Sequence, residues 1–394
     1  MKTLTDATAK AGLCLSGGGF RAALFHLGAL RRLNDLGLLS RMNTISSVSG
    51  GSILNGLLAV CWRDLQRDAT GRFMNFEAAI EKPMRVFCSN NLRNHVLIAD
   101  RLNPMNWLRL AREDYSITNK LVEAYDSDLL HGADMQTLRG VLDAGGPRFV
   151  LCATSMQTGV NWEFEPKGIG DYQIGRSWKP DMKLAVAVAA SSAFPLAFPP
   201  LHVSMEGGSW EFGDVGLEGI DKMRETAELT DGGVYDNMGL EPVWKSHDQV
   251  FCSDGGAPFS SDTDPGDAFI SRLMRVNAIT DRQSRALRRR ILIGAFERGE
   301  YGGTFWGIHT KIGDYPLQPP ANGYTGAALA AIAAIRTDLN IFSAEEQLVL
   351  MNHGWLLAGA AIQAHCVDWP WTPSTAPDKD LLNGVKALAA LQNK

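Results

Sequence analysis

Residues 11–36 read AGLCLSGGGFRAALFHLGALRRLNDL, and this stretch decides the fold class. The apolar run at 11–16 predicts a short buried strand, and three glycines at 17–19 predict a tight break after it. Leucines at helical spacing then predict a helix over 20–36, with Gly37 as its C-terminal cap. A strand, a glycine turn and a helix in this order are typical of an α/β fold with a mainly parallel sheet.

The same order returns in TISSVSGGSILNGLLAVCWRDL at residues 44–65. β-Branched residues predict a strand over 44–48, and apolar spacing predicts a helix over 53–65. Further along, the sequence predicts strands at 148–154, 161–164 and 249–253, a hairpin over 206–229, and helices at 184–190 and 269–293. Strands that alternate with helices predict a parallel sheet flanked by helices.

Composition is that of an ordinary globular protein, since the 394 residues are 45% hydrophobic and 21% charged. We expect a single domain over 10–365, with a helical cap or insertion at 72–146, and a C-terminal tail or helix at 366–394. The net charge of −5 argues against a nucleic-acid partner. The sequence does not indicate an oligomeric state.

Six scattered cysteines without a CxxC pair indicate reduced core residues of a cytoplasmic protein, rather than a disulfide framework or a zinc site. The first ten residues lack an apolar signal segment, and no window reaches the ~18 uncharged apolar residues of a transmembrane helix. Peripheral contact with a membrane surface stays open.

Four serines crowd the turn between the strand at 44–48 and the helix that follows. Ser49 fits a nucleophile elbow, a sharp strand-to-helix turn with small residues two positions to either side, because Ser47 precedes it and Gly51 follows it. A nucleophile at Ser47 would place a bulky isoleucine in the turn, and Ser52 falls in the helix. Ser49 is therefore the candidate nucleophile, and the alternative is that it only caps the helix.

The glycines at 17–19 allow three interpretations. They can form a simple turn between strand and helix. They also fit the GxGxxG/A pattern of dinucleotide-binding turns, with Ala22 as its last residue, but no acidic residue ends the next strand to bind a ribose. The third interpretation is an oxyanion hole, in which backbone N–H groups stabilise negative charge on a carbonyl oxygen.

A serine nucleophile needs a base. Four histidines come late enough to complete a Ser-acid-His triad, but none follows an apolar strand in a short turn: His247, His309, His353 and His365. Asp231 and Asp254 are better placed, since two glycines follow each of them and either could take the serine proton if burial raised its pKa. A simple Asp-Gly turn is the alternative at both positions.

Four blocks in this order resemble the patatin-like phospholipase family. They are LSGGGFR at 15–21, similar to the glycine-rich oxyanion segment, SVSGG at 47–51, similar to the elbow, AASSAFP at 189–195, and DGGVYDN at 231–237, similar to the Asp-Gly-Gly block. Two positions depart from the family pattern. Ser47 stands where glycine is usual, and Ala22 follows the basic residue where glycine is frequent.

This resemblance covers about residues 10–260. It implies a three-layer α/β/α fold with a mainly parallel central sheet and a helical insertion. It favours Asp231 over Asp254, because residues 234–237 follow the family pattern. The site residues that it implies are Ser49 and Asp231 as a catalytic dyad, Gly17, Gly18 and Gly19 as the oxyanion hole, and Arg21 as their support.

The function implied by the resemblance is a serine lipid acyl hydrolase of the phospholipase A or lysophospholipase type, which cleaves carboxylic esters through an acyl-enzyme and needs no metal or cofactor. A non-catalytic lipid-binding or scaffold protein on the same fold and a Ser-His-Asp esterase stay open as alternatives. The region 85–135, with Leu97, Ile98, Trp107 and Leu108, could form a lid or pack as ordinary helices. The arginines at 272–290 could attract anionic headgroups or lie on a solvated helix.

Overall fold

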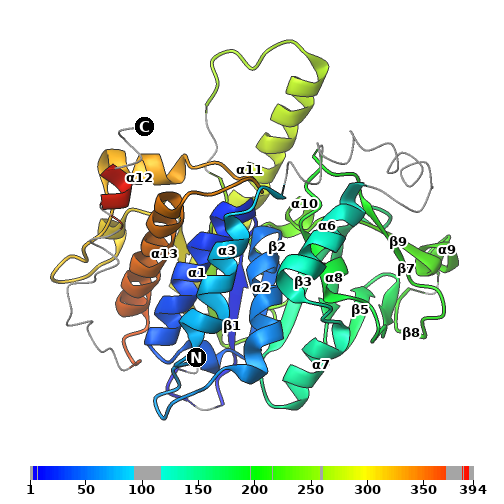
Figure 1. Ribbon diagram of the computed structural model, residues 1–394, viewed down its shortest axis with the longest axis horizontal. Coiled ribbons are helices and arrows are strands. Elements are labelled where there is room, and N and C mark those ends of the chain that lie inside the picture. The colour runs from blue at the N-terminus through cyan, green and yellow to red at the C-terminus, as the bar shows by residue number, and fades with distance from the viewer. Residues whose placement is uncertain are drawn as a thin grey trace.

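The computed structural model describes residues 3–6, 8–92, 117–195, 197–214, 216–257, 261–369, 384 and 386–389. The apolar residues expected in a lid, Leu97, Ile98, Trp107 and Leu108, lie outside these ranges. Figure 1 shows a central sheet with helices packed against it and one helix, α11 (Phe269–Glu297), that projects from the body.

The described residues form a sheet of 11 strands, and its central part is parallel in the order β11-β10-β1-β2-β3. These strands are β1 (Ala11–Leu15), β2 (Thr44–Val48), β3 (Arg148–Ser155), β10 (Gln249–Asp254) and β11 (Gly302–Gly307). β1 lies in the middle, between β2 and β10, and all of its residues are buried. Burial on both faces explains why it reads as a continuous apolar run. The predicted α/β class is confirmed.

Six further strands extend the sheet in the antiparallel sense: β4 (Asn161–Glu165), β5 (Gly168–Asp171), β6 (Gly175–Ser177), β7 (Leu201–Ser204), β8 (Trp210–Glu211) and β9 (Thr226–Asp231). The hairpin expected over 206–229 is wrong. β9 pairs with β7, which begins before the predicted hairpin, and a long connection with β8 and α9 (Ile220–Glu225) separates them. Because β7 is short and only alternate residues are buried, its apolar signal is weak.

Side chains of β1 and β10 alternate between two apolar cores, one on each face of the sheet. Leu13 and Phe251 belong to the large core, whereas Cys14 and Cys252 belong to a smaller core that Leu292 of α11 also joins. The large core includes residues of α1 (Gly19–Asp35), α2 (Gly50–Cys61) and α13 (Ala344–His365). Helices on both faces give the three-layer arrangement that the sequence predicted.

The other helices are α3 (Lys82–Cys88), α6 (Ile117–Tyr125), α7 (Met135–Asp143), α8 (Leu184–Ser191), α10 (Gly233–Asp236) and α12 (Gly326–Ala333). Within the predicted insertion, Phe87, Tyr125 and Leu138 are buried in the large core, so its described helices pack on the same core as α1. In the C-terminal tail, Ala387 and Leu388 are buried there too.

All six cysteines are free thiols; five are buried and Cys61 is half-buried, as the sequence predicted. None of the helices in the described ranges combines the length and the apolar character needed to cross a membrane.

Candidate active site

Ser49 stands at the junction of β2 and α2, where the strand turns sharply into the helix. Its φ of 51° and ψ of −119° lie outside the regions that non-glycine residues ordinarily adopt, so the turn is strained. The Ser49 carbonyl accepts the N–H of Ser52 at 2.8 Å, and α2 begins at Gly50, three residues earlier than predicted. A serine with strained backbone angles at a strand-to-helix turn is typical of a nucleophile elbow.

A chain of buried hydroxyl groups lies beneath this turn. The Ser49 N–H donates to Ser191 Oγ at 2.9 Å, and Ser191 Oγ shares a hydrogen bond of 2.8 Å with Ser52 Oγ. Ser52 Oγ is bonded to Ser47 Oγ at 2.9 Å, and Ser47 Oγ also accepts an N–H of Asn55 at 2.9 Å. The serines around Ser49 therefore tie the turn to α2 and α8.

The glycine turn after β1 packs directly on this elbow. A Cβ at Gly50 would lie 2.1 Å from the Gly19 carbonyl oxygen, and a Cβ at Gly17 would lie 3.1 Å from Ser49 Cβ. Only glycine allows so close an approach between the two turns. The glycine turn and the serine turn, which α1 and β2 separate in the sequence, thus pack directly against each other.

The three predicted oxyanion donors differ in their availability. The Gly17 N–H donates to the Asn237 carbonyl at 3.0 Å, so this group is not free to bind an oxyanion. The N–H groups of Gly18 and Gly19 have no acceptor within the described residues. Gly19 opens α1, and a helix N-terminus leaves its N–H groups unpaired and carries partial positive charge.

Asp231 reaches the same place from the other side of β3. It ends β9, where it is paired with Ala153 of β3, while Val48 of β2 is paired with Cys152 of β3. Asp231 and Ser49 are thus brought to the same edge of the sheet, one strand apart, although 231 − 49 = 182 residues separate them in the chain.

Burial raises the pKa of Asp231 from its ordinary value of 3.8 to about 7. The Gly233 N–H, 2.7 Å from Oδ1, and the Ser49 side chain counteract this rise, and the negative charge of Asp281 adds to it. Asp231 Oδ2 is buried and has no hydrogen-bond partner in the part of the chain that the structure describes. A carboxylate with an open oxygen and a pKa near neutrality is suited to accept a proton.

A model of the patatin-like phospholipase family matches residues 13–244 of this sequence. The chain belongs to the patatin-like phospholipase family.

A solved structure shares the fold of this patatin-like chain. Human group IVD cytosolic phospholipase A2, in complex with methyl gamma-linolenyl fluorophosphonate, is 14% identical over 100% of this chain, with a TM-score of 0.50. The chain spans 61% of that protein's length. VipD from Legionella pneumophila is 13% identical, with 98% of this chain and 75% of VipD covered and a TM-score of 0.38. A comparison with curated proteins gave no match.

The four candidate histidines of this patatin-like chain lie elsewhere. His247 Nε2 is 2.9 Å from Thr44 Oγ1, at the start of β2, whereas Ser49 follows the end of that strand. The other three have different partners: His309 with Arg289, His353 with the Ile308 carbonyl, and His365 with the ring of Tyr315. Within the described residues no histidine hydrogen-bonds to Ser49 or Asp231, so the Ser-His-Asp alternative finds no support there.

Asp254, the second candidate base, is held in an ion pair. Its two carboxylate oxygens accept from Arg285 Nη2 at 2.9 and 3.0 Å, and the Gly256 N–H donates to it at 3.0 Å. Burial alone would raise its pKa, but Arg285, His309 and the Gly256 N–H together lower the pKa below its ordinary value. Asp254 therefore stays charged, and both of its carboxylate oxygens are bound to Arg285.

Arg21, which was predicted to support the glycine turn, binds backbone carbonyls of neighbouring segments. Its guanidinium donates to the carbonyls of Gly255 at 2.9 Å and Ile335 at 2.7 Å, and burial lowers its pKa to about 10. Because a Cβ on Gly18 would lie 2.9 Å from the Gly255 oxygen, Arg21 holds the segment that packs behind the glycine turn.

Sequence reasoning did not assign a role to Ser191, Asn237 or Asp281. Ser191 and Asn237 lie in the blocks at 189–195 and 231–237, and the resemblance of these blocks to the family was a signal for both residues. Asp281 lies on α11, where no local pattern connects it with Asp231.

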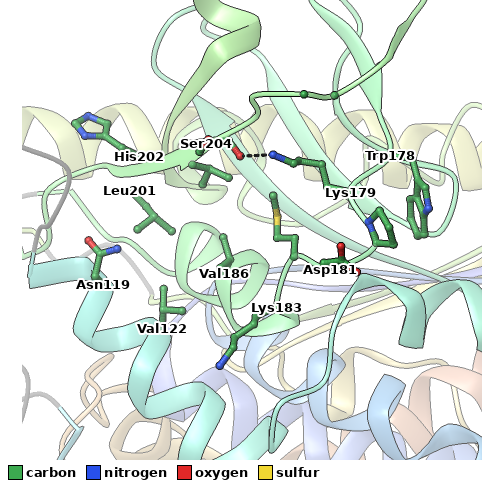
Figure 2. Close-up of a pocket in the computed structure, with 15 residues that line it drawn as sticks. Asn119, Val122, Trp178, Lys179, Asp181, Lys183, Val186, Leu201, His202 and Ser204 are labelled. Carbon is green, nitrogen blue, oxygen red and sulfur yellow. Dashed lines mark hydrogen bonds between the residues drawn. The ribbon is translucent and has the colours of Figure 1, made fainter.

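A cavity of about 520 Å³ opens between α6, α8 and β7, with Val122, Val186 and Leu201 on its apolar side (Figure 2). None of the six predicted site residues lines it. Lys179 at its rim donates to the Ser204 carbonyl at 3.0 Å. No cluster of three or more metal-ligating side chains occurs in the described ranges.

Proposed function

We propose that the chain is a serine lipid acyl hydrolase of the phospholipase A or lysophospholipase type, which cleaves carboxylic esters without a metal or cofactor. Family membership supports lipid hydrolysis. The observation that supports this chemistry is a serine on a strained turn beside a buried carboxylate whose pKa is about 7.

In the first half of the reaction, Ser49 Oγ attacks the ester carbonyl carbon while Asp231 Oδ2 takes the hydroxyl proton. Negative charge develops on the carbonyl oxygen, and the N–H groups of Gly18 and Gly19 stabilise it. The ester C–O bond then breaks, Asp231 gives its proton to the leaving alcohol, and the acyl group remains on Ser49.

In the second half, Asp231 takes a proton from water as the water oxygen adds to the acyl carbonyl. The fatty acid leaves when the bond to Ser49 Oγ breaks, and Ser49 regains the proton from Asp231. Atoms and charges balance in both halves without a redox partner.

Release of fatty acid from mixed phospholipid vesicles tests this proposal, with wild type, Ser49→Ala and Asp231→Asn compared with and without a chelator. Each substitution removes a reacting group, so we expect activity to fall by about 10³-fold or more in both variants. The chelator should change nothing. Full activity of Ser49→Ala, or loss of wild-type activity with the chelator, would contradict the proposed mechanism.

Labelling with a fluorophosphonate separates this enzyme from the non-catalytic alternative. If the wild type releases no fatty acid but is labelled at Ser49, the nucleophile works and the substrate is a different ester. If neither release nor labelling occurs, the lipid-binding or scaffold function is the better conclusion.

We also propose that α11 makes peripheral contact with an anionic lipid bilayer. The helix projects from the body (Figure 1). It carries five exposed apolar residues, here called the apolar stripe: Phe269, Leu273, Val276, Leu287 and Ile291. Helical periodicity puts these residues on one side of the helix, and the same helix carries seven arginines between 272 and 290. Apolar residues beside arginines are typical of helices that lie on negatively charged membranes. The cytoplasmic location and the single domain over 10–365 stay predictions.

A further inference from the structure

A second cavity, of about 350 Å³, lies between α11 and the carboxyl ends of β10 and β11. Its charged and titratable lining comprises Arg282, Arg285, Arg289 and Asp281 from α11, and Asp254 and His309 from the sheet side. Three arginines face two aspartates here, so the lining carries excess positive charge when the histidine is neutral. Cavities of this size hold small-molecule ligands.

Arg289 has no carboxylate partner within the described residues. Its Nη1 donates to His309 Nε2 at 2.9 Å. A guanidinium cannot accept a hydrogen bond, so His309 is the acceptor, and its ring is neutral with the proton on Nδ1. His309 Nδ1 is itself buried and lacks an acceptor in the described part of the chain. A partly buried cation and its neutral partner are thus left without an anion, which is costly unless a ligand supplies one.

Arg285 has a different position in the same cavity. Its Nη2 donates to both oxygens of Asp254, at 2.9 and 3.0 Å, and its Nη1 donates to the Ala257 carbonyl at 2.7 Å. Its charge is therefore compensated and its geometry is fixed. The pair of Arg285 and Asp254 forms a wall of the cavity and leaves the charge of Arg289 uncompensated.

The cavity adjoins the candidate active site. Gly255, next to Asp254, accepts from Arg21 and packs against Gly18 of the glycine turn. On the α11 side, Asp281 lines the cavity and its charge acts on Asp231. The cavity is thus connected to the glycine turn through Gly255 and to Asp231 through the charge of Asp281.

We propose that this cavity binds the phosphoryl group of an anionic ligand, with Arg289 as its principal contact and His309 holding the guanidinium in position. Two phosphoryl oxygens match the two parallel N–H donors of a guanidinium, which makes arginine the preferred residue for this group. The phosphoryl group could belong to the headgroup of a phospholipid bound for hydrolysis, or to free phosphate. The headgroup version rests on the proposed function, whereas phosphate binding by itself does not.

Calorimetric titration of the full chain with inorganic phosphate tests the site, with sodium chloride at equal ionic strength as the reference. Arg289→Gln keeps a donor for His309 but removes the charge, and we expect phosphate to bind about tenfold to a hundredfold more weakly. Arg289→Lys keeps the charge without the paired donors and should give an intermediate affinity. The melting temperatures of both variants without phosphate check that they fold.

The matched control is Arg298→Gln. Arg298 follows the end of α11, is exposed, and pairs with Glu300 outside the cavity. This variant removes the same charge just beyond the end of α11, so it should bind phosphate as the wild type does.

Hydrolysis in mixed micelles separates the two sources of the phosphoryl group. If a headgroup occupies the cavity, Arg289→Gln raises KM about tenfold for a phospholipid but not for diacylglycerol with the same acyl chains, and phosphate competes with the phospholipid alone. If free phosphate is the ligand, Arg289→Gln loses phosphate binding, and its KM changes equally for the phospholipid and for diacylglycerol.

The proposal is overturned if millimolar phosphate does not bind to the wild type, or if it binds equally to the wild type, Arg289→Gln and Arg298→Gln. A wild type that hydrolyses no lipid would contradict the proposed function but not this site, because the titration still decides on phosphate binding.

Discussion

Asp231 and Asp254 share the same local sequence, an aspartate followed by two glycines at the end of a strand, yet their pKa values shift in opposite directions. Arg285 compensates the charge of Asp254 and lowers its pKa. Among the residues that the structure describes, no arginine or lysine is paired with Asp231, whose pKa rises to about 7. Arg285 lies 31 residues beyond Asp254. The local pattern therefore predicted two candidate bases, and only tertiary contacts distinguish them.

The raised pKa of Asp231 predicts a pH dependence. A base works in its charged form, so kcat/KM on a water-soluble ester should rise with pH through about 7 and level off above it. Asp281→Asn removes a negative charge that raises this pKa, so the rising limb should move to lower pH. The exposed Asp143→Asn is the control. A profile that is unchanged in Asp281→Asn would contradict the assignment of Asp231 as the titrating base.

Ser47, which departs from the family's usual glycine, is predicted to stabilise this chain. Its hydroxyl bonds to Ser52 and to the Val150 carbonyl and accepts an N–H of Asn55. Ser47→Gly should lower the free energy of unfolding by about 1–3 kcal/mol more than Ser46→Gly, since within the described residues the Ser46 hydroxyl hydrogen-bonds only to the Cys152 sulfur, at 3.7 Å. Urea denaturation of the two variants measures the difference, and equal midpoints would show that the hydroxyl chain contributes nothing.

At the scale of elements, strands with strong apolar or β-branched runs were predictable, whereas other elements were not, among them β11 and α13. β11 is GGTFWG, and three glycines in six residues hide its strand character. α13 is apolar on most of its circumference, so no amphipathic period marks it, although Glu346 and Ser343 form a capping box at its start. The parallel order of β10 next to β1 also depends on pairing across more than 200 residues, which local patterns do not specify.

The exposed stripe of α11 gives a prediction at this scale. Leu273→Asp places a charge in the stripe and should weaken binding to anionic vesicles about tenfold or more, because an apolar side chain no longer enters the lipid surface. Hydrolysis of a water-soluble ester should not change. Vesicle sedimentation measures the binding.

The control for this change is Val86→Asp, which alters an exposed apolar residue on α3. If both substitutions weaken vesicle binding equally, or if Leu273→Asp has no effect, α11 is not the contact with the bilayer.

At the scale of the molecule, α1 and α13, which lie far apart in the sequence, pack tightly against each other. A Cβ on Gly28 of α1 would lie 1.8 Å from the Met351 carbonyl oxygen, and one on Gly354 of α13 would lie 1.9 Å from the Phe25 carbonyl oxygen. Backbone therefore packs on backbone where α1 crosses α13. Since α1 starts at the glycine turn, this contact also supports the candidate site.

Gly354→Ala is predicted to push α1 and α13 apart. The methyl group meets backbone atoms that cannot rotate away, so we expect a loss of about 1–3 kcal/mol in stability and a lower melting temperature. Gly140→Ala in α7 is the matched control, because its Cβ would meet only the end of the Arg63 side chain at 3.5 Å and alanine favours the helix. Calorimetry that shows equal melting temperatures for Gly354→Ala and wild type would disprove the tight crossing.

The separation of Ser49 and Asp231 along the chain has a consequence during synthesis. A ribosome that has just added Ser49 must add 231 − 49 = 182 residues before Asp231 exists, which takes about 10–40 s at ordinary elongation rates. The nucleophile is therefore made long before its base, and α13 follows later still. If the proposed activity is correct, a nascent chain cannot cleave the membranes of the cell that makes it until most of the protein has been completed.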